Sequence, residues 1–206
     1  EYIQFQYPVS DFYSDSLGLC PNETTKFISN SNGISLSQFW DFGDGNSSNI
    51  QNPTHTYSSN GFYNVSLTVV DSFGCPNTLT RNNYIRVEKP IASFQVNGST
   101  SNCPPLISSF SNQSTNDVIS WVWDFGDGIS SVLENPSHAY SNSGIYNVSL
   151  IVNNDLNCSD TLVLDDLITI LGPSGNFYIS DTLVCQHEQV IFSPISINTD
   201  NYFWDF

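Results

Sequence analysis

Basic residues are almost missing from this chain of 206 residues, in which four Lys and Arg stand against 20 Asp and Glu, for a formal charge of −16. Such a surface repels phosphate backbones and anionic lipid headgroups, which argues against nucleic acids and membrane surfaces as partners. Long hydrophobic runs are missing too, and none approaches the roughly 20 residues that span a bilayer. We therefore expect no nucleic-acid binding and no membrane insertion.

Apolar residues also lack a helical period, and alternation with a period of two takes its place. Along Gly61–Val70, residues 63, 65, 67 and 69 are aromatic or aliphatic, and the residues between them are mainly polar. Further short strands are predicted at residues 9–13, 24–29, 38–42 and 79–87. Strands of this length, separated by Asn, Ser, Gly and Pro, predict an all-β fold of antiparallel sandwiches.

The sequence repeats itself with an offset of 83 positions. Trp-Asp-Phe-Gly-Asp-Gly at residues 40–45 returns at 123–128, and Asn-Pro-x-His-x-Tyr at 52–57 returns at 135–140. The last three residues, 204–206, are the opening of a third Trp-Asp-Phe motif. We predict three domains, at residues 1–88, 89–171 and 172–206, with the third cut short and the array continuing further. Short proline-containing links at 87–90 and 171–173 predict a semi-rigid rod.

Four cysteines follow the same offset, because Cys20 maps to Cys103 and Cys75 maps to Cys158. Within each copy the two cysteines lie 55 positions apart. We predict one disulfide inside each copy, Cys20–Cys75 and Cys103–Cys158, and a partner beyond the chain for Cys185. Reduced buried thiols are the alternative, and zinc is disfavoured because close Cys-x-x-Cys spacing is missing. Disulfides imply an oxidising compartment, so the protein is expected to be secreted, outside the cell or on its surface.

An Asp and His cluster beside the Gly-Asp-Gly turn resembles a catalytic constellation at first sight. A catalytic site duplicated in every copy would be unusual, whereas residues that build the fold must recur. We therefore predict no catalytic residue and no enzyme, and assign the recurring side chains to the fold. They are Trp40, Asp41, Gly43, Asp44, Gly45, His55, Tyr57 and Tyr63 in the first copy, and Trp123, Asp124, Gly126, Asp127, Gly128, His138, Tyr140 and Tyr146 in the second.

No cofactor or metal site is predicted, although calcium stays open because acidic and amide oxygens are abundant. We expect calcium, if bound, at the domain junctions, since no spaced Asp-x-Asp-x-Asp-Gly loop occurs. Trp121 is a separate candidate. The first copy carries Gln38 at its position, so an aromatic ring there is not needed for folding. Trp121 shares the face of Trp123, two residues on, and is expected at the edge of the sheet, where stacking on a sugar or contact with a partner is one interpretation of its ring.

These motifs, in this order and completed by Gly-x-Tyr-x-Val-x-Leu-x-Val at residues 61–69 and 144–152, resemble the polycystic kidney disease (PKD) domain. The resemblance covers nearly the whole length of both copies. It implies tandem immunoglobulin-like sandwiches of about seven strands, used outside the cell as spacers, adhesive modules or protein contacts, with no catalysis. Tandem PKD repeats with a cysteine pair resemble those of giant Bacteroidota surface proteins, including gliding adhesins exported by the type IX system.

The leading hypothesis is therefore a structural or adhesive segment of a large cell-surface or filament-forming protein. The alternative is a pair of accessory modules that help a secreted hydrolase engage polysaccharide or collagen. The expected partners are neighbouring repeats of the same chain, other copies that associate laterally, and a surface protein or glycan of unknown identity.

Overall fold

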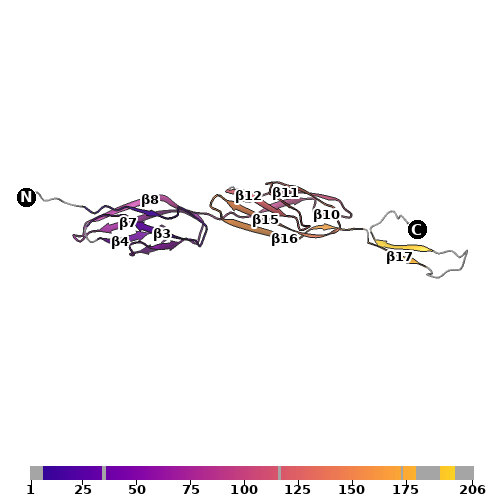
Figure 1. Cartoon of the computed structure of the whole chain (residues 1–206), viewed down its shortest axis with the longest axis horizontal. Helices are drawn as coiled ribbons and strands as arrows, with labels where there is room; N and C mark the ends of the chain where they lie inside the picture. The colour runs from indigo at the N-terminus through magenta and orange to yellow at the C-terminus, as the bar shows by residue number, and fades with distance from the viewer. Residues whose placement is uncertain (1–6, 34–35, 116, 173, 180–190, 198–206) are drawn as a thin grey trace, which may run out of the picture. The chain divides into compact units, whose positions relative to one another are not determined.

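The computed structural model of the chain describes residues 7–33, 36–115, 117–172, 174–179 and 191–197. The chain divides into two compact units. The first unit contains Glu1–Pro90 with Asp117–Ile119 and Asn153–Asp160; the second contains Ile91–Asn116, Ser120–Val152 and Thr161–Phe206. Every regular element in the described residues is a strand, and a helix able to cross a membrane is not found among them. The all-β fold predicted from the sequence is confirmed (Figure 1).

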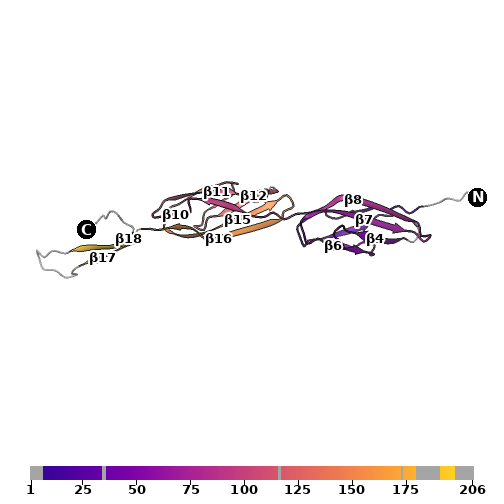
Figure 2. The same ribbon diagram turned by 180° about the vertical axis from the view of Figure 1, so that it is seen from behind.

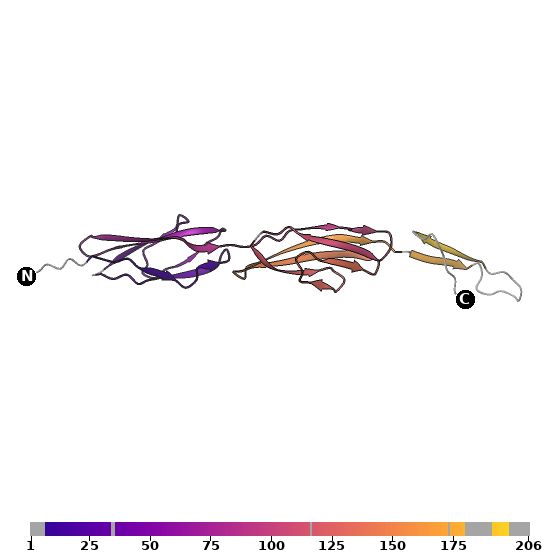
Figure 3. The same ribbon diagram turned by 90° about the horizontal axis from the view of Figure 1, so that it is seen from above.

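The first unit is a sandwich of a three-stranded and a five-stranded sheet, which lie in two layers in Figure 3. The smaller sheet has the order β1 (Phe12–Ser14), β3 (Thr24–Ser29), β6 (Thr54–Thr56). The larger has the order β2 (Gly18–Leu19), β8 (Pro76–Val87), β7 (Gly61–Val70), β4 (Ser37–Asp41), β5 (Ser47–Ser48). Figure 2 shows β4, β6, β7 and β8 from the opposite side.

The second unit repeats this topology strand for strand. Its three-stranded sheet has the order β14 (Ser137–Tyr140), β11 (Leu106–Asn112), β9 (Phe94–Asn97). Its five-stranded sheet has the order β10 (Thr100–Ser101), β16 (Ser159–Ile170), β15 (Gly144–Asn154), β12 (Val118–Asp124), β13 (Ser130–Ser131). After it, β17 (Ser174–Ile179) pairs antiparallel with β18 (Phe192–Ile197).

Alternation along β7 explains how the sandwich forms. Val65, Leu67 and Val69 are fully buried, and the residues between them are more exposed. From β4 the indole of Trp40 projects between the sheets and meets Phe12 of β1 at 5.1 Å and Phe27 of β3 at 5.6 Å between ring centroids. Burying a large apolar side chain contributes about 1.5–3 kcal/mol, so this aromatic group holds the two sheets together.

Two short strands depart from the predicted antiparallel pattern. Strand β2 runs parallel to the end of β8, with Gly18 opposite Arg86 and Leu19 opposite Val87. Strand β10 does the same at the end of β16. The chain therefore reaches Cys20 and Cys103 beside the last residues of β8 and β16, and this placement decides how the cysteines pair.

Candidate functional site

The Gly-Asp-Gly turn after β4 is built by its own acidic side chains. Asp41 Oδ1 accepts a hydrogen bond from the amide of Gly43 at 2.9 Å, and Asp44 Oδ1 accepts one from the amide of Asn46 at 3.0 Å. Gly43 has φ of +80°, and a β-carbon there would overlap the carbonyl oxygen of Asn64. Only glycine fits this position without strain, which explains why the motif carries it.

His55 closes the turn from strand β6. Its Nε2 lies 2.8 Å from Asp44 Oδ2, and its ring stacks on Phe42 with centroids 4.1 Å apart. Tyr57 is fully buried and donates its hydroxyl proton to the carbonyl oxygen of Phe42 at 3.1 Å. Tyr63 donates to the carbonyl oxygen of Ser59 at 2.7 Å, the bond of a tyrosine corner.

The second copy repeats this arrangement. Asp127 Oδ2 lies 2.7 Å from Nε2 of His138, which stacks on Phe125. Asp124 accepts from the amide of Gly126, Tyr140 donates to the carbonyl of Phe125, and Tyr146 donates to the carbonyl of Asn142. Trp123 is fully buried, Gly126 has φ of +81°, and Gly128 has φ of +89°. The structure thus brings the recurring residues of each copy together around one turn.

Titration fits a structural task for these groups. Burial raises the pKa of a carboxyl group, but at Asp44 the hydrogen bonds from Asn46 and His55 outweigh burial, and its pKa lies below the ordinary value of 3.8. Burial, helped by the charge of Asp44, raises the pKa of Tyr57, so its hydroxyl stays protonated as a donor. Among the described residues, no group of three or more His, Cys, Asp or Glu side chains lies close enough to share a metal ion.

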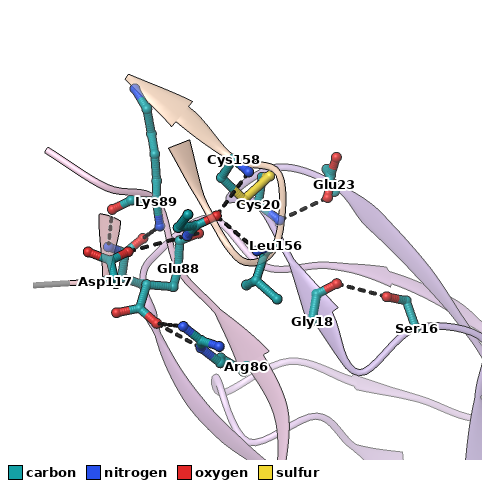
Figure 4. Close-up of a disulfide and its surroundings, with 12 residues drawn as sticks. Ser16, Gly18, Cys20, Glu23, Arg86, Glu88, Lys89, Asp117, Leu156 and Cys158 are labelled. Atoms are coloured by element: carbon teal, nitrogen blue, oxygen red, sulfur yellow. Dashed lines mark hydrogen bonds and ion pairs between the residues drawn. A yellow bond between two sulfur atoms is a disulfide. The ribbon is translucent and has the colours of Figure 1, made fainter. Parts of the chain in front are cut away.

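The disulfides inside each copy were predicted wrongly. Cys20 is bonded to Cys158, 138 positions away, with their α-carbons 5.5 Å apart (Figure 4). Cys75 and Cys103 are free. The bridge joins a cysteine of the first copy to a cysteine of the second. In the compact units, the segment Asn153–Asp160 that carries Cys158 belongs with Glu1–Pro90.

The reason is the length of β8. Cys20 follows β2, which pairs with residues 86 and 87 at the end of β8, whereas Cys75 stands just before the first residue of that strand. Twelve residues at about 3.3 Å each separate the two ends by roughly 40 Å. Disulfides need α-carbons closer than about 7 Å, so Cys20 cannot reach Cys75. Strand β16 keeps Cys103 from Cys158 in the same way.

Apolar and polar contacts surround the bridge. Leu156 packs against Gly18, where a β-carbon would overlap the leucine side chain (Figure 4). Arg86 donates to Asp155 at 2.7 Å and to Glu88 at 2.7 Å, and its bond lowers the pKa of Asp155. These residues, with the bridge, are called the disulfide junction below.

Two further contacts complete the disulfide junction. Lys89 Nζ lies 2.7 Å from Asp160 Oδ1, and Asn154 donates to the carbonyl oxygen of Glu88 at 3.2 Å. Exposed ion pairs contribute only about 0–1 kcal/mol each, so the covalent bond and the Leu156 contact carry most of the stabilisation. Sequence inspection did not single out Gly18, Arg86, Asp155 or Leu156.

Comparison with known proteins places both copies in one family. The model for the PKD domain matches residues 8–87 and 88–170. A microbial collagenase of Vibrio alginolyticus is 53% identical over 49 residues, which are 24% of this chain and 6% of the collagenase. A collagenase of Bacillus cereus is 47% identical over 57 residues, 26% of this chain and 6% of that enzyme.

A solved structure gives a similar match. The crystal structure of a PKD domain from the Vibrio cholerae metalloprotease PrtV is 30% identical, covers 41% of this chain and 99% of the solved one, and has a TM-score of 0.35. In the two collagenases, by contrast, the matched segment is only 6% of the enzyme, so this chain spans a small part of the length of these relatives.

Proposed function

Because the chain belongs to the PKD domain family, we propose that it is a non-catalytic, extracellular segment that connects and spaces parts of a larger secreted protein. PKD domains are in general non-catalytic modules. In each copy the turn Asp bonds a backbone amide of its own turn and a His side chain of a neighbouring strand, which supports a structural task. A disulfide between distant residues supports export to an oxidising compartment.

The observation that carries this proposal is the bridge between Cys20 and Cys158. Tension applied to the two ends of the chain passes from residue 20 to residue 158 through the disulfide. Residues 21–157 include most of the core of the first sandwich, without Phe12 and Leu19, and Trp123 of the second. They lie inside the covalent loop and bear none of that tension. A segment whose ends are joined by such a covalent bridge is suited to bear mechanical load between the parts that it connects.

Pulling the chain by its ends tests the connector directly. With the bridge intact, we expect no unfolding step from residues 21–157. After reduction, the same molecule should release roughly 450–500 Å of additional chain, at about 3.3–3.6 Å per residue. A step of that length in the oxidised molecule would contradict the load-bearing proposal.

Two finer functions are compatible with a connector, and the comparisons favour the second. A stalk segment of a surface adhesin, such as a gliding adhesin, accords with the covalent bridge. Accessory modules of a secreted hydrolase acting on collagen or polysaccharide accord with the relatives, which are collagenases and a metalloprotease. We therefore propose the accessory module as the better-supported finer function.

Sedimentation with insoluble collagen, chitin and cellulose separates the two. An accessory module should be depleted from solution by one of them, and a stalk segment by none. Trp121→Gln provides a matched variant, because Gln38 occupies the corresponding position of β4. Loss of depletion in this variant would assign the contact to the second copy, whereas depletion by an unrelated particle to the same extent would remove the binding function.

A further inference from the structure

The turn that carries Cys158 has a counterpart in the first copy. Asn154 Oδ1 accepts hydrogen bonds from the amides of Leu156 at 3.1 Å and Cys158 at 3.0 Å. The amide of residue 154 also donates to the carbonyl oxygen of Cys158 at 3.1 Å. Residue 157 has positive φ, +62°. This pattern ties five residues into a compact tip between β15 and β16.

Asp71 builds the same tip between β7 and β8. Its Oδ1 accepts from the amides of Phe73 and Cys75, both at 2.9 Å, and its own amide donates to the carbonyl oxygen of Cys75 at 3.2 Å. Gly74 has φ of +83° at the position of residue 157. Phe73 therefore stands where the second copy has Leu156, and Cys75 stands where it has Cys158.

The two tips differ in what they touch. The tip of the second copy is docked, since Leu156 packs on Gly18 and Cys158 is bonded to Cys20. On the tip of the first copy, Phe73 is 80% exposed and the thiol of Cys75 is free. The turn at Asp71–Cys75 has the same hydrogen bonds as the docked turn at Asn154–Cys158. It differs in that its phenylalanine is exposed and its cysteine is free.

The second copy also carries a counterpart of the place on which the tip docks. We call this place, a cysteine after a short strand that pairs parallel with the end of a long one, the receptor. Cys20 follows β2, whose Gly18 and Leu19 pair parallel with the end of β8. Cys103 comes after β10 with Asn102 between them, and Thr100 and Ser101 pair parallel with Thr169 and Ile170 at the end of β16. Cys103 is exposed and its thiol is free. The part of the chain that the structure describes thus holds one undocked tip, at Cys75, and one free cysteine beside a short parallel strand, Cys103.

We propose that Cys75 and Cys103 are the two halves of further junctions of the Cys20–Cys158 kind, each made with another PKD repeat. The tip Asp71–Cys75 docks beside a cysteine that follows a β2-like strand, and a tip of the same build docks beside Cys103. The partner is a PKD repeat of this type, and a second copy of this chain supplies both halves. The inference rests on the geometry of the junction and not on the proposed function.

The bond forms by thiol–disulfide exchange with a small-molecule disulfide such as glutathione disulfide. The thiolate of Cys75 attacks one glutathione sulfur, forms a mixed disulfide and releases a glutathione thiolate. The thiolate of Cys103 then attacks the sulfur of Cys75 and releases the second glutathione. Two protein thiols lose two protons and two electrons, and one glutathione disulfide is reduced to two thiols.

Oxidation of the purified chain tests the proposal. In a glutathione redox buffer the intermolecular bridges between Cys75 and Cys103 are 75–75, 103–103 and 75–103, and bridges to Cys185 are counted separately. Random pairing makes the mixed 75–103 bridge equal to the sum of the two symmetric ones. Docking should raise the mixed bridge about tenfold over that sum, because Phe73 becomes buried. Mass spectrometry of peptides from unreduced oligomers counts each bridge, with Cys20–Cys158 as the internal reference.

Two variants keep the test decisive. Phe73→Ser leaves the turn and the thiol in place and should return the distribution to random pairing. Thr100→Gly restores the glycine that Gly18 provides at the same register position, and should raise the mixed bridge further. A random distribution in both the unaltered chain and the Thr100→Gly variant would overturn the proposal, as would a mixed-bridge excess that survives Phe73→Ser. The binding assays on collagen and polysaccharide are independent of either result.

Discussion

Leu156 packs on the α-carbon of Gly18, and a β-carbon on residue 18 would overlap its Cδ2 atom. Residue 18 lies in a strand of the first copy, and residue 156 lies in the tip between two strands of the second. The contact stands beside the Cys20–Cys158 bridge, so an apolar fit and a covalent bond hold the same point (Figure 4).

Enlarging residue 18 should therefore weaken the disulfide junction. We expect Gly18→Val to cost about 1–3 kcal/mol, the usual cost of overpacking. Adding Leu156→Ala should recover part of this loss, because the smaller side chain makes room, and a double-mutant cycle by denaturant unfolding measures the coupling. Gly61→Ala is the control, since a β-carbon there meets Tyr63 only at ordinary contact distance, 3.5 Å. Strictly additive losses would show that the two residues do not share a contact.

Removing the bridge should destabilise the protein more than removing the free thiols. In the chain-entropy model, a bridge that closes a loop of 138 residues stabilises by about 5 kcal/mol. We expect a loss of up to this size for Cys20→Ser combined with Cys158→Ser. The paired control is Cys75→Ser combined with Cys103→Ser, which should leave the unfolding midpoint unchanged and leave the effect of reducing agent intact. Equal losses in the two double variants would contradict the assignment.

Asp44 should make stability depend on acid pH. Its pKa is lowered in the folded state, so its contribution is fully present above the ordinary value of 3.8 and is lost as pH falls through the folded value. We expect Asp44→Asn to cost about 1–3 kcal/mol at neutral pH and the difference from the unaltered protein to shrink below about pH 4. Urea unfolding from pH 7 to pH 2 gives this difference directly. If the difference in unfolding free energy between the two proteins stays constant from pH 7 to pH 2, the charge of Asp44 does not contribute to stability.

The two tyrosine hydroxyls should differ in their effect on stability. Tyr57→Phe leaves the carbonyl oxygen of Phe42 without its donor in a buried place, so we expect a loss of about 1–3 kcal/mol. Tyr63→Phe removes an exposed bond to Ser59 and should cost less. Thermal unfolding of both variants ranks them, and the reverse order would mean that the corner and not the buried bond supports the turn.

Sequence alone could predict what is local and repeated. Strands at 24–29 and 61–70 agree with β3 and β7, because alternation of apolar and polar residues between turn-forming residues fixes such elements within a few residues. Trp40 and Trp123 were assigned to the fold and are fully buried. The residues of the Gly-Asp-Gly turn could be recognised as structural because each recurs 83 positions later.

The cysteine pairing could not be predicted from the same regularity. A spacing of 55 inside each copy suits a bridge within the copy, but a pair separated by one spacing plus one repeat, as in Cys20–Cys158, suits the repeat equally well. The choice depends on the parallel pairing of β2, a strand of only two residues, with the end of β8. A strand that short leaves no recognisable alternation, so the sequence held no signal for it.

The bridge itself is the most direct test of this account. Proteolysis of the unreduced protein at acid pH, with free thiols blocked beforehand, followed by mass spectrometry, identifies which cysteine peptides are linked. For the monomer we predict a linked pair containing Cys20 and Cys158, with Cys75 and Cys103 recovered as blocked thiols. Linked pairs Cys20–Cys75 and Cys103–Cys158 would contradict the account.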